Sequence, residues 1–111
     1  MSTKNEYVEY ILDLLAPLGQ VETARMFGGT LLKKDGKQLG VVFRDTLYFK
    51  VINSDVQKRY KSEGSEQFTY TRKDKKDPVV IKNWWTVPED SLDNSEKLVL
   101  LAEEVLRSQD S

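Results

Sequence analysis

The sequence of 111 residues contains no histidine and no cysteine. Without histidine, the chain lacks the usual general base at neutral pH and the commonest protein ligand for metals. Without cysteine, it has no thiolate nucleophile, no disulfide and no sulfur ligand. The two absences together exclude zinc sites, and the lack of histidine excludes a Ser-His triad. We therefore expect no catalytic residue, no metal site and no cofactor. Glu89, Asp90 and Asp93 could together hold Mg²⁺, but capping of a helix N-terminus is the favoured interpretation of these acids.

The sequence also lacks an excess of either charge and any long apolar run. Its formal net charge is −1 at pH 7, which gives no overall attraction to nucleic acid or to an anionic membrane. No apolar run approaches the roughly 20 residues that span a bilayer, and residues 1–6 lack the apolar core of a signal peptide. We therefore expect a cytoplasmic protein without a membrane partner, and the length predicts one domain over residues 1–111.

Three segments have the apolar spacing of amphipathic helices. The first ends near Ala16, because Pro17 lacks an amide hydrogen and clashes with the preceding turn. A short helix runs from Asn53 or Ser54 to about residue 62, and the longest helix runs from a cap at Asp93 to about residue 108. On this last helix, residues 103 and 104 are glutamates predicted to lie on the exposed side.

Six segments have the pattern of β-strands: residues 21–27, 30–33, 38–44, 47–52, 67–72 and 79–85. Asp35-Gly36 is a strong hairpin signal, and Asp45-Thr46 makes another tight connection. In strand 38–44, Leu39, Val41 and Phe43 are expected on one face. Because the connections are too short for parallel crossovers, the strands form an antiparallel meander. The prediction is an α+β fold of two layers, a meander sheet packed by the N-terminal and C-terminal helices, with a short middle helix.

A pair of glycines interrupts the first two strands, in the stretch Arg25-Met26-Phe27-Gly28-Gly29. Glycine tolerates positive φ and a close backbone approach, so a bend between two strands is the favoured interpretation. Exposed amides at such a bend could instead bind an anion. Arg25 is then either an edge residue in an ion pair, which we favour, or a contact to that anion.

Residues 24–29 resemble the signature of the TfoX N-terminal domain family, the TfoX/Sxy competence regulators and their short relatives. The similarity continues through residues 42–50, 64–70 and 85–89, and so spans nearly the whole chain. The resemblance implies an α+β fold, a stand-alone single-domain member and a bacterial role in transcription regulation, with competence for DNA uptake as the best-known context. The motif residues that carry it are Arg25, Met26, Phe27, Gly28, Gly29, Phe68, Tyr70, Trp85 and Pro88.

Three functions remain open. The favoured one is a non-enzymatic regulatory module that binds a protein partner or itself as a homodimer. Trp84 and Trp85 point to opposite faces of one strand, so one is expected to be partly exposed unless something covers it, and Trp84 with Tyr48 is the candidate interface. The second is a nucleic-acid binder, and the third is a small enzyme of unknown type. Nucleic-acid contacts would come from two basic loops, containing Lys33, Lys34 and Lys37, and Arg72, Lys73, Lys75 and Lys76.

Overall fold

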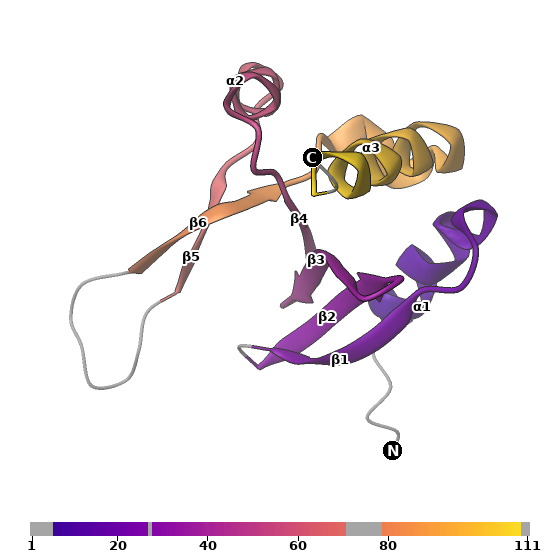
Figure 1. The fold of residues 1–111 in the computed structure, drawn as a ribbon. Helices are drawn as coiled ribbons and strands as arrows, with labels where there is room; N and C mark the ends of the chain where they lie inside the picture. The colour runs from indigo at the N-terminus through magenta and orange to yellow at the C-terminus, as the bar shows by residue number, and fades with distance from the viewer. Residues whose placement is uncertain (1–5, 27, 71–78, 110–111) are drawn as a thin grey trace.

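The structure, a computed structural model, describes residues 6–26, 28–70 and 79–109 (Figure 1). Phe27, Arg72, Lys73, Lys75 and Lys76 lie outside the described residues, as do the contacts predicted for them. In chain order the elements are α1 (Glu6–Leu14), η1 (Ala16–Leu18), β1 (Glu22–Met26), β2 (Gly29–Lys34), β3 (Lys37–Phe43), β4 (Thr46–Lys50), α2 (Ser54–Ser62), β5 (Gln67–Tyr70), β6 (Val79–Thr86), η2 (Glu89–Asp93) and α3 (Ser95–Ser108), where η marks a 3-10 helix.

The described strands form one sheet in the order β1-β2-β3-β4-β6-β5, and every neighbouring pair is antiparallel. The predicted α+β fold with an antiparallel sheet is therefore confirmed. The first four strands make the expected meander. The last two form a hairpin that joins the sheet through β6, which pairs with β4 and leaves β5 at the edge.

The turns between strands follow the local sequence. Gly28 has a φ of +81°, and a Cβ added to Gly29 would lie 2.4 Å from the carbonyl oxygen of Val42. The predicted bend at the glycine pair is thus the turn between β1 and β2, where only glycine fits without strain. Asp35 and Gly36 both have positive φ, as expected for the hairpin turn between β2 and β3.

Two local predictions are wrong by one residue. The turn between β3 and β4 is centred on Arg44-Asp45, both with positive φ, and Thr46 already belongs to β4. The cap of α3 is Asn94, whose side chain accepts a hydrogen bond from the amide of Lys97, because η2 occupies the chain up to Asp93. The cap of α2 is Asn53, one of the two residues predicted for it.

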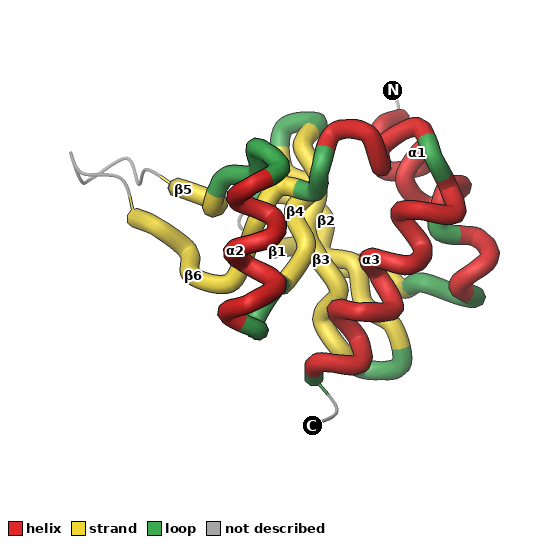
Figure 2. Tube along the Cα trace, turned by 90° about the horizontal axis from the view of Figure 1, so that it is seen from above, coloured by secondary structure: helices red, strands yellow, loops and turns green. Residues whose placement is uncertain are grey.

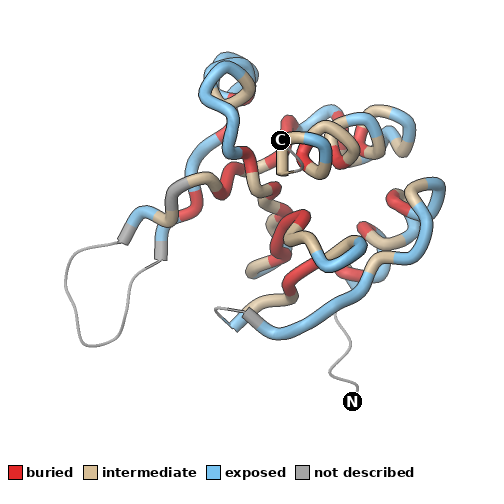
Figure 3. The backbone as a smooth tube through the Cα atoms, in the orientation of Figure 1, coloured by how far each residue is buried: buried red, intermediate tan, exposed pale blue. Residues whose placement is uncertain are grey.

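The three helices pack on one face of the sheet, as predicted for α1 and α3. Figure 2 shows α2 in front of the strands and α1 and α3 beside them, and Figure 3 shows buried segments where strands and helices meet. Burial of these side chains removes apolar surface from water and stabilises the fold. This helix-covered core contains Val8, Ile11, Leu15, Leu32, Leu39, Val42, Leu47, Phe49, Val51, Tyr60, Trp85, Val87, Leu98, Ala102 and Val105.

The opposite face of the sheet has a second, smaller core built from strands, which we call the sheet core. It contains Leu31, Val41, Phe68 and Trp84, with Phe43, Tyr48 and Ile81 packed against it, and no helical residue belongs to it among those described. The ring of Phe68 in β5 lies 5.2 Å from that of Phe43 and 4.6 Å from that of Tyr48. Since β6 separates β5 from β4 in the sheet, these contacts require the sheet to curl.

Irregularities in strand pairing decide which side chains reach which face. The register between β2 and β3 shifts, so that Leu32 pairs with Gly40 and Lys33 with Gln38. Leu39 therefore lies in the helix-covered core, whereas Val41 lies in the sheet core, and the prediction that they share a face is wrong. An extra residue in one strand breaks the two-residue alternation, which a simple periodic pattern does not show.

Candidate functional site

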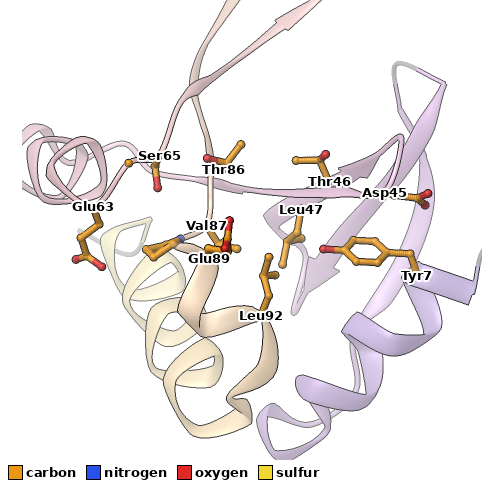
Figure 4. A pocket seen from close by; sticks show the side chains of 12 residues that line it. Tyr7, Asp45, Thr46, Leu47, Glu63, Ser65, Thr86, Val87, Glu89 and Leu92 are labelled. Atoms are coloured by element: carbon orange, nitrogen blue, oxygen red, sulfur yellow. The ribbon is translucent and has the colours of Figure 1, made fainter.

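A cleft of about 380 Å³ opens where α1, the turn before β4, the end of β6, the connection from α2 to β5, and η2 meet (Figure 4). Its floor is apolar and includes Leu47, Val87, Pro88 and Leu92. Leu47 is 1% exposed and Val87 5% exposed, so the floor is an extension of the helix-covered core. The cleft therefore has rigid, apolar walls on its inner side.

The rim of the cleft is acidic. Asp45, Glu63 and Glu89 line it and are exposed, and no lysine or arginine is among its lining residues within the described chain. Figure 4 shows the side chain of Glu89 near the middle of the cleft, with Glu63 at one end and Asp45 at the other. Carboxylates at a surface with low-dielectric walls concentrate cations and repel anions.

Hydroxyl groups add polar contacts to this acidic rim. Ser65 is only 7% exposed, and its Oγ has no hydrogen-bond partner among the described residues. Figure 4 shows the Ser65 hydroxyl directed into the space beside Val87. Thr86 Oγ1 accepts a hydrogen bond from the amide of Glu66 at 2.9 Å, which fixes the wall next to Ser65.

Tyr7 brings a further hydroxyl to the cleft from α1, and Figure 4 shows its ring pointing inward toward Leu47. Burial raises the pKa of Tyr7 above its usual value of 10.0, and the neighbouring Tyr10 and Asp45 raise it further. The phenol is therefore neutral at physiological pH, where it donates or accepts hydrogen bonds but does not act as a base. No feature of the described cleft pairs a nucleophile with a general base.

The residues of the predicted interface, Trp84 and Tyr48, lie in or against the sheet core. Trp84 is 4% exposed and Trp85 is 8% exposed, so neither is partly exposed and the exception in the expectation, a cover over the second tryptophan, applies. Trp85 packs under the helices, and Trp84 is covered by the curl of the sheet onto Phe68. Tyr48 is half-buried beside Phe68, and burial, followed by the charge of Glu66, raises the pKa of its hydroxyl.

The basic hairpin predicted for nucleic acid lies against the C-terminal helix. Lys33, Lys34 and Lys37 are half-buried, and Lys34 Nζ lies 3.7 Å from the carboxylate of Asp35. A shallow depression there also includes Glu103 and Arg107 of α3. Acidic neighbours thus reduce the positive field on which binding of a phosphate backbone depends.

The acids of the last helix and of the preceding turn differ from their predicted roles. Glu104 is half-buried and accepts two hydrogen bonds from the guanidinium of Arg59 in α2, at 3.0 and 2.5 Å. Asp90 accepts a hydrogen bond from Lys97 Nζ at 2.5 Å. Within residues 6–26, 28–70 and 79–109, no acidic group of three could hold a metal ion, so the hypothetical Mg²⁺ site from Glu89, Asp90 and Asp93 is not formed.

The motif residues occupy structural positions where the structure describes them. Arg25 is exposed on the edge strand β1, opposite Thr30, while Phe68 and Trp85 are core residues and Pro88 is a buried part of the cleft floor. No pattern in the sequence indicates the cleft. Tyr7, Ser65 and Glu89 come from distant parts of the chain, and no local pattern brings them together.

The described elements define a small α+β domain with one sheet, one layer of helices and an acidic cleft. The sequence matches the family model of the TfoX N-terminal domain over residues 13–109, so the chain belongs to the TfoX N-terminal domain family. This is not a known enzyme family. A comparison with curated protein sequences gives no match. Within the described residues, no helix is both long enough and apolar enough to cross a bilayer.

Proposed function

We propose that the protein is a non-enzymatic regulatory module that acts by binding a protein, with a second copy of itself as the first partner to test. Membership in the TfoX N-terminal domain family supports a regulatory role, of which bacterial competence is the context implied by the resemblance. A cytoplasmic location belongs to the same proposal. The composition supports the non-enzymatic part of the proposal, because the sequence has neither histidine nor cysteine to act as a general base or nucleophile.

The observation that carries the proposal is the sheet core. Among the described residues this core has no helical cover, and Phe43, Tyr48 and Ile81 at its margin remain partly exposed. Partly exposed aromatic and aliphatic side chains above a fully packed layer are typical of protein contact surfaces. An antiparallel sheet with such a face readily forms a symmetric dimer.

The experiment measures the mass of the protein in solution over a range of concentrations by sedimentation. We expect a mass that rises toward twice the chain mass of 12.8 kDa as concentration increases. The variant Ile81→Lys places a charge at the margin of the sheet core, and we expect it to weaken the dimer about tenfold or more.

The matched control is Leu100→Lys, which makes a similar change on α3 at a residue that is 64% exposed and outside the sheet core. This control should leave the mass profile of the parent chain unchanged. A parent chain that stays at 12.8 kDa at the highest concentrations would exclude the homodimer. Equal effects of the two variants would exclude the sheet core as its interface.

A further inference from the structure

The acidic cleft is separate from the sheet core and has a different chemistry. Its volume of about 380 Å³ lies in the range of small-ligand sites. Within the described chain, three carboxylates and four hydroxyl-bearing residues surround an apolar floor, and no cationic side chain lines it. This combination suits a ligand with an apolar body and a positive end.

An unpartnered buried hydroxyl gives a second, independent indication of a ligand. Ser65 is only 7% exposed, and its Oγ has no hydrogen-bond partner among the described residues. A buried polar group without a partner costs free energy, which a bound molecule can recover where the group borders an open cleft. Ser65 lines this cleft, whereas the unpartnered hydroxyl of Tyr60 does not. The Ser65 hydroxyl points into the cleft, as Figure 4 shows.

We infer that the cleft binds an organic cation, an ammonium or guanidinium group carried on an alkyl chain. The alkyl chain packs on Leu47 and Val87, and the charged end lies against Glu89. Ammonium and guanidinium groups donate hydrogen bonds and accept none, so carboxylate and hydroxyl oxygens are their natural partners. The inference does not depend on the proposed protein contact, which uses the opposite side of the sheet.

Position in the cleft identifies Glu89 as the principal contact. Glu63 interacts electrostatically with two cations, Arg59 and Lys97. These two cations donate hydrogen bonds to Glu104 and Asp90, respectively. Asp45 follows Arg44, whose guanidinium lies 5.1 Å from the centre of the Phe43 ring. Glu89, Glu63 and Asp45 all lack an ion pair within the described chain, so each carboxylate can meet a cation. Glu89 alone of the three lies near the middle of the cleft, beside Val87 (Figure 4).

The described acids also favour an organic cation over a metal ion. They form no group of three that could hold a metal, and a hard divalent ion needs several oxygen ligands at short distance. The apolar floor adds nothing to the binding of a bare ion, whereas it contributes to the binding of an alkyl chain through the hydrophobic effect. A lysine or arginine side chain of another protein and a free amine share this chemistry.

The test is a nuclear magnetic resonance titration of the ¹⁵N-labelled full chain with N-acetyl-lysine methylamide. N-acetyl-norleucine methylamide serves as the matched ligand, because it has the same alkyl chain without the ammonium group. We expect saturable shifts of the Ser65 and Val87 amides with the lysine probe in the millimolar range, and much smaller shifts that stay far from saturation with the norleucine probe. Equal shifts with both probes, or no shift with either, would overturn the inference.

Two protein variants test whether the carboxylate of Glu89 binds the ammonium group of the probe. Glu89→Gln should weaken binding of the lysine probe about tenfold, because it removes the partner of the ammonium group and keeps the size of the side chain. Glu22→Gln makes the same change at an exposed residue of β1 outside the cleft lining and should leave the affinity within about twofold. An unchanged affinity in Glu89→Gln would overturn the assignment to this cleft, as would an equal loss in both variants.

The variant Ser65→Ala tests the site without a change of charge, and spermidine as a third ligand distinguishes a free amine from a basic side chain of another protein. Ser65→Ala removes the hydroxyl at a position where it has no described partner, so the fold should be kept and the affinity reduced several-fold. An unchanged affinity in that variant would contradict the role of Ser65. Spermidine binding more tightly than the lysine probe assigns the cleft to a free amine, and the reverse order assigns it to a basic side chain. Both orders support the cation site.

Discussion

The two faces of the sheet differ in how they become buried. On one face, Val8 of α1 and Leu98 of α3 cover the strands, so burial follows from helices whose apolar stripes are visible in the sequence. On the other face, Phe68 is fully buried although its described core contains only strand residues. The comparison shows that strand curvature can build a core where no second layer of helices exists.

A second difference separates the sheet core from the cleft. The sheet core is apolar to its margin, whereas the cleft combines an apolar floor with Asp45, Glu63 and Glu89 at its rim. An apolar margin suits a broad contact with another protein. A small, acidic depression suits a single charged group. One small domain thus offers two surfaces with different binding chemistry.

The largest expected effect tests whether the sheet core is as well packed as the helix-covered core. Phe68 and Phe49 are both fully buried, one in each core. We expect Phe68→Ala and Phe49→Ala each to lower the free energy of unfolding by about 3–5 kcal/mol, because both leave a cavity in a packed interior. Urea denaturation measures both. A loss below about 1 kcal/mol for Phe68→Ala alone would mean that the sheet core is loosely packed.

An intermediate effect concerns a buried hydroxyl on the helix-covered face. Tyr60 is fully buried, and its Oη has no hydrogen-bond partner among the described residues. We expect Tyr60→Phe to raise the free energy of unfolding by about 1 kcal/mol, because an unsatisfied buried polar atom is removed. A loss of stability in urea denaturation would show that the hydroxyl has a partner.

The same variant changes the dependence of stability on pH. Burial, followed by the charge of Glu104, raises the pKa of Tyr60 well above its usual value of 10.0. Above pH 10 the unfolded chain loses this proton while the folded chain keeps it, so the stabilisation present below pH 10 is lost as the pH rises. The slope approaches about 1.4 kcal/mol per pH unit for one such group.

Alkaline urea denaturation compares the slopes of the parent chain and Tyr60→Phe. We expect a smaller slope in the variant, with the remainder coming from Tyr7 and Tyr48, whose pKa values are also raised. Identical slopes would show that Tyr60 does not keep its proton in the folded state.

The smallest expected effect concerns the ion pair between the helices. Arg59 in α2 and Glu104 in α3 have side chains that are 45% and 28% exposed. We expect a double-mutant cycle with Arg59→Gln and Glu104→Gln to give a coupling of about 0.2–1 kcal/mol that falls with added salt. The more exposed pair of Lys97 and Asp90 should couple less strongly. A larger coupling for Lys97 and Asp90 would contradict this ranking.

Local sequence patterns predicted the elements well where a single physical cause dominates. The apolar spacing of Val8 and Ile11 marks α1, and Asp35-Gly36 marks a turn because both residues accept positive φ. The prediction failed for the face of Leu39, and no local pattern showed what covers Trp84. The register shift beside Leu39 and the curl that covers Trp84 both depend on neighbouring strands that are remote in the sequence.

Residue type and order were enough to predict the helices, most strand positions, the family and the absence of histidine and cysteine chemistry. These properties depend on residue type and on spacing within one turn or one strand. The burial of both tryptophans, and the cleft that brings Tyr7, Ser65 and Glu89 together, follow from the packing of the folded chain. Such properties depend on how separate elements pack, because burial and proximity arise between segments that share no local pattern.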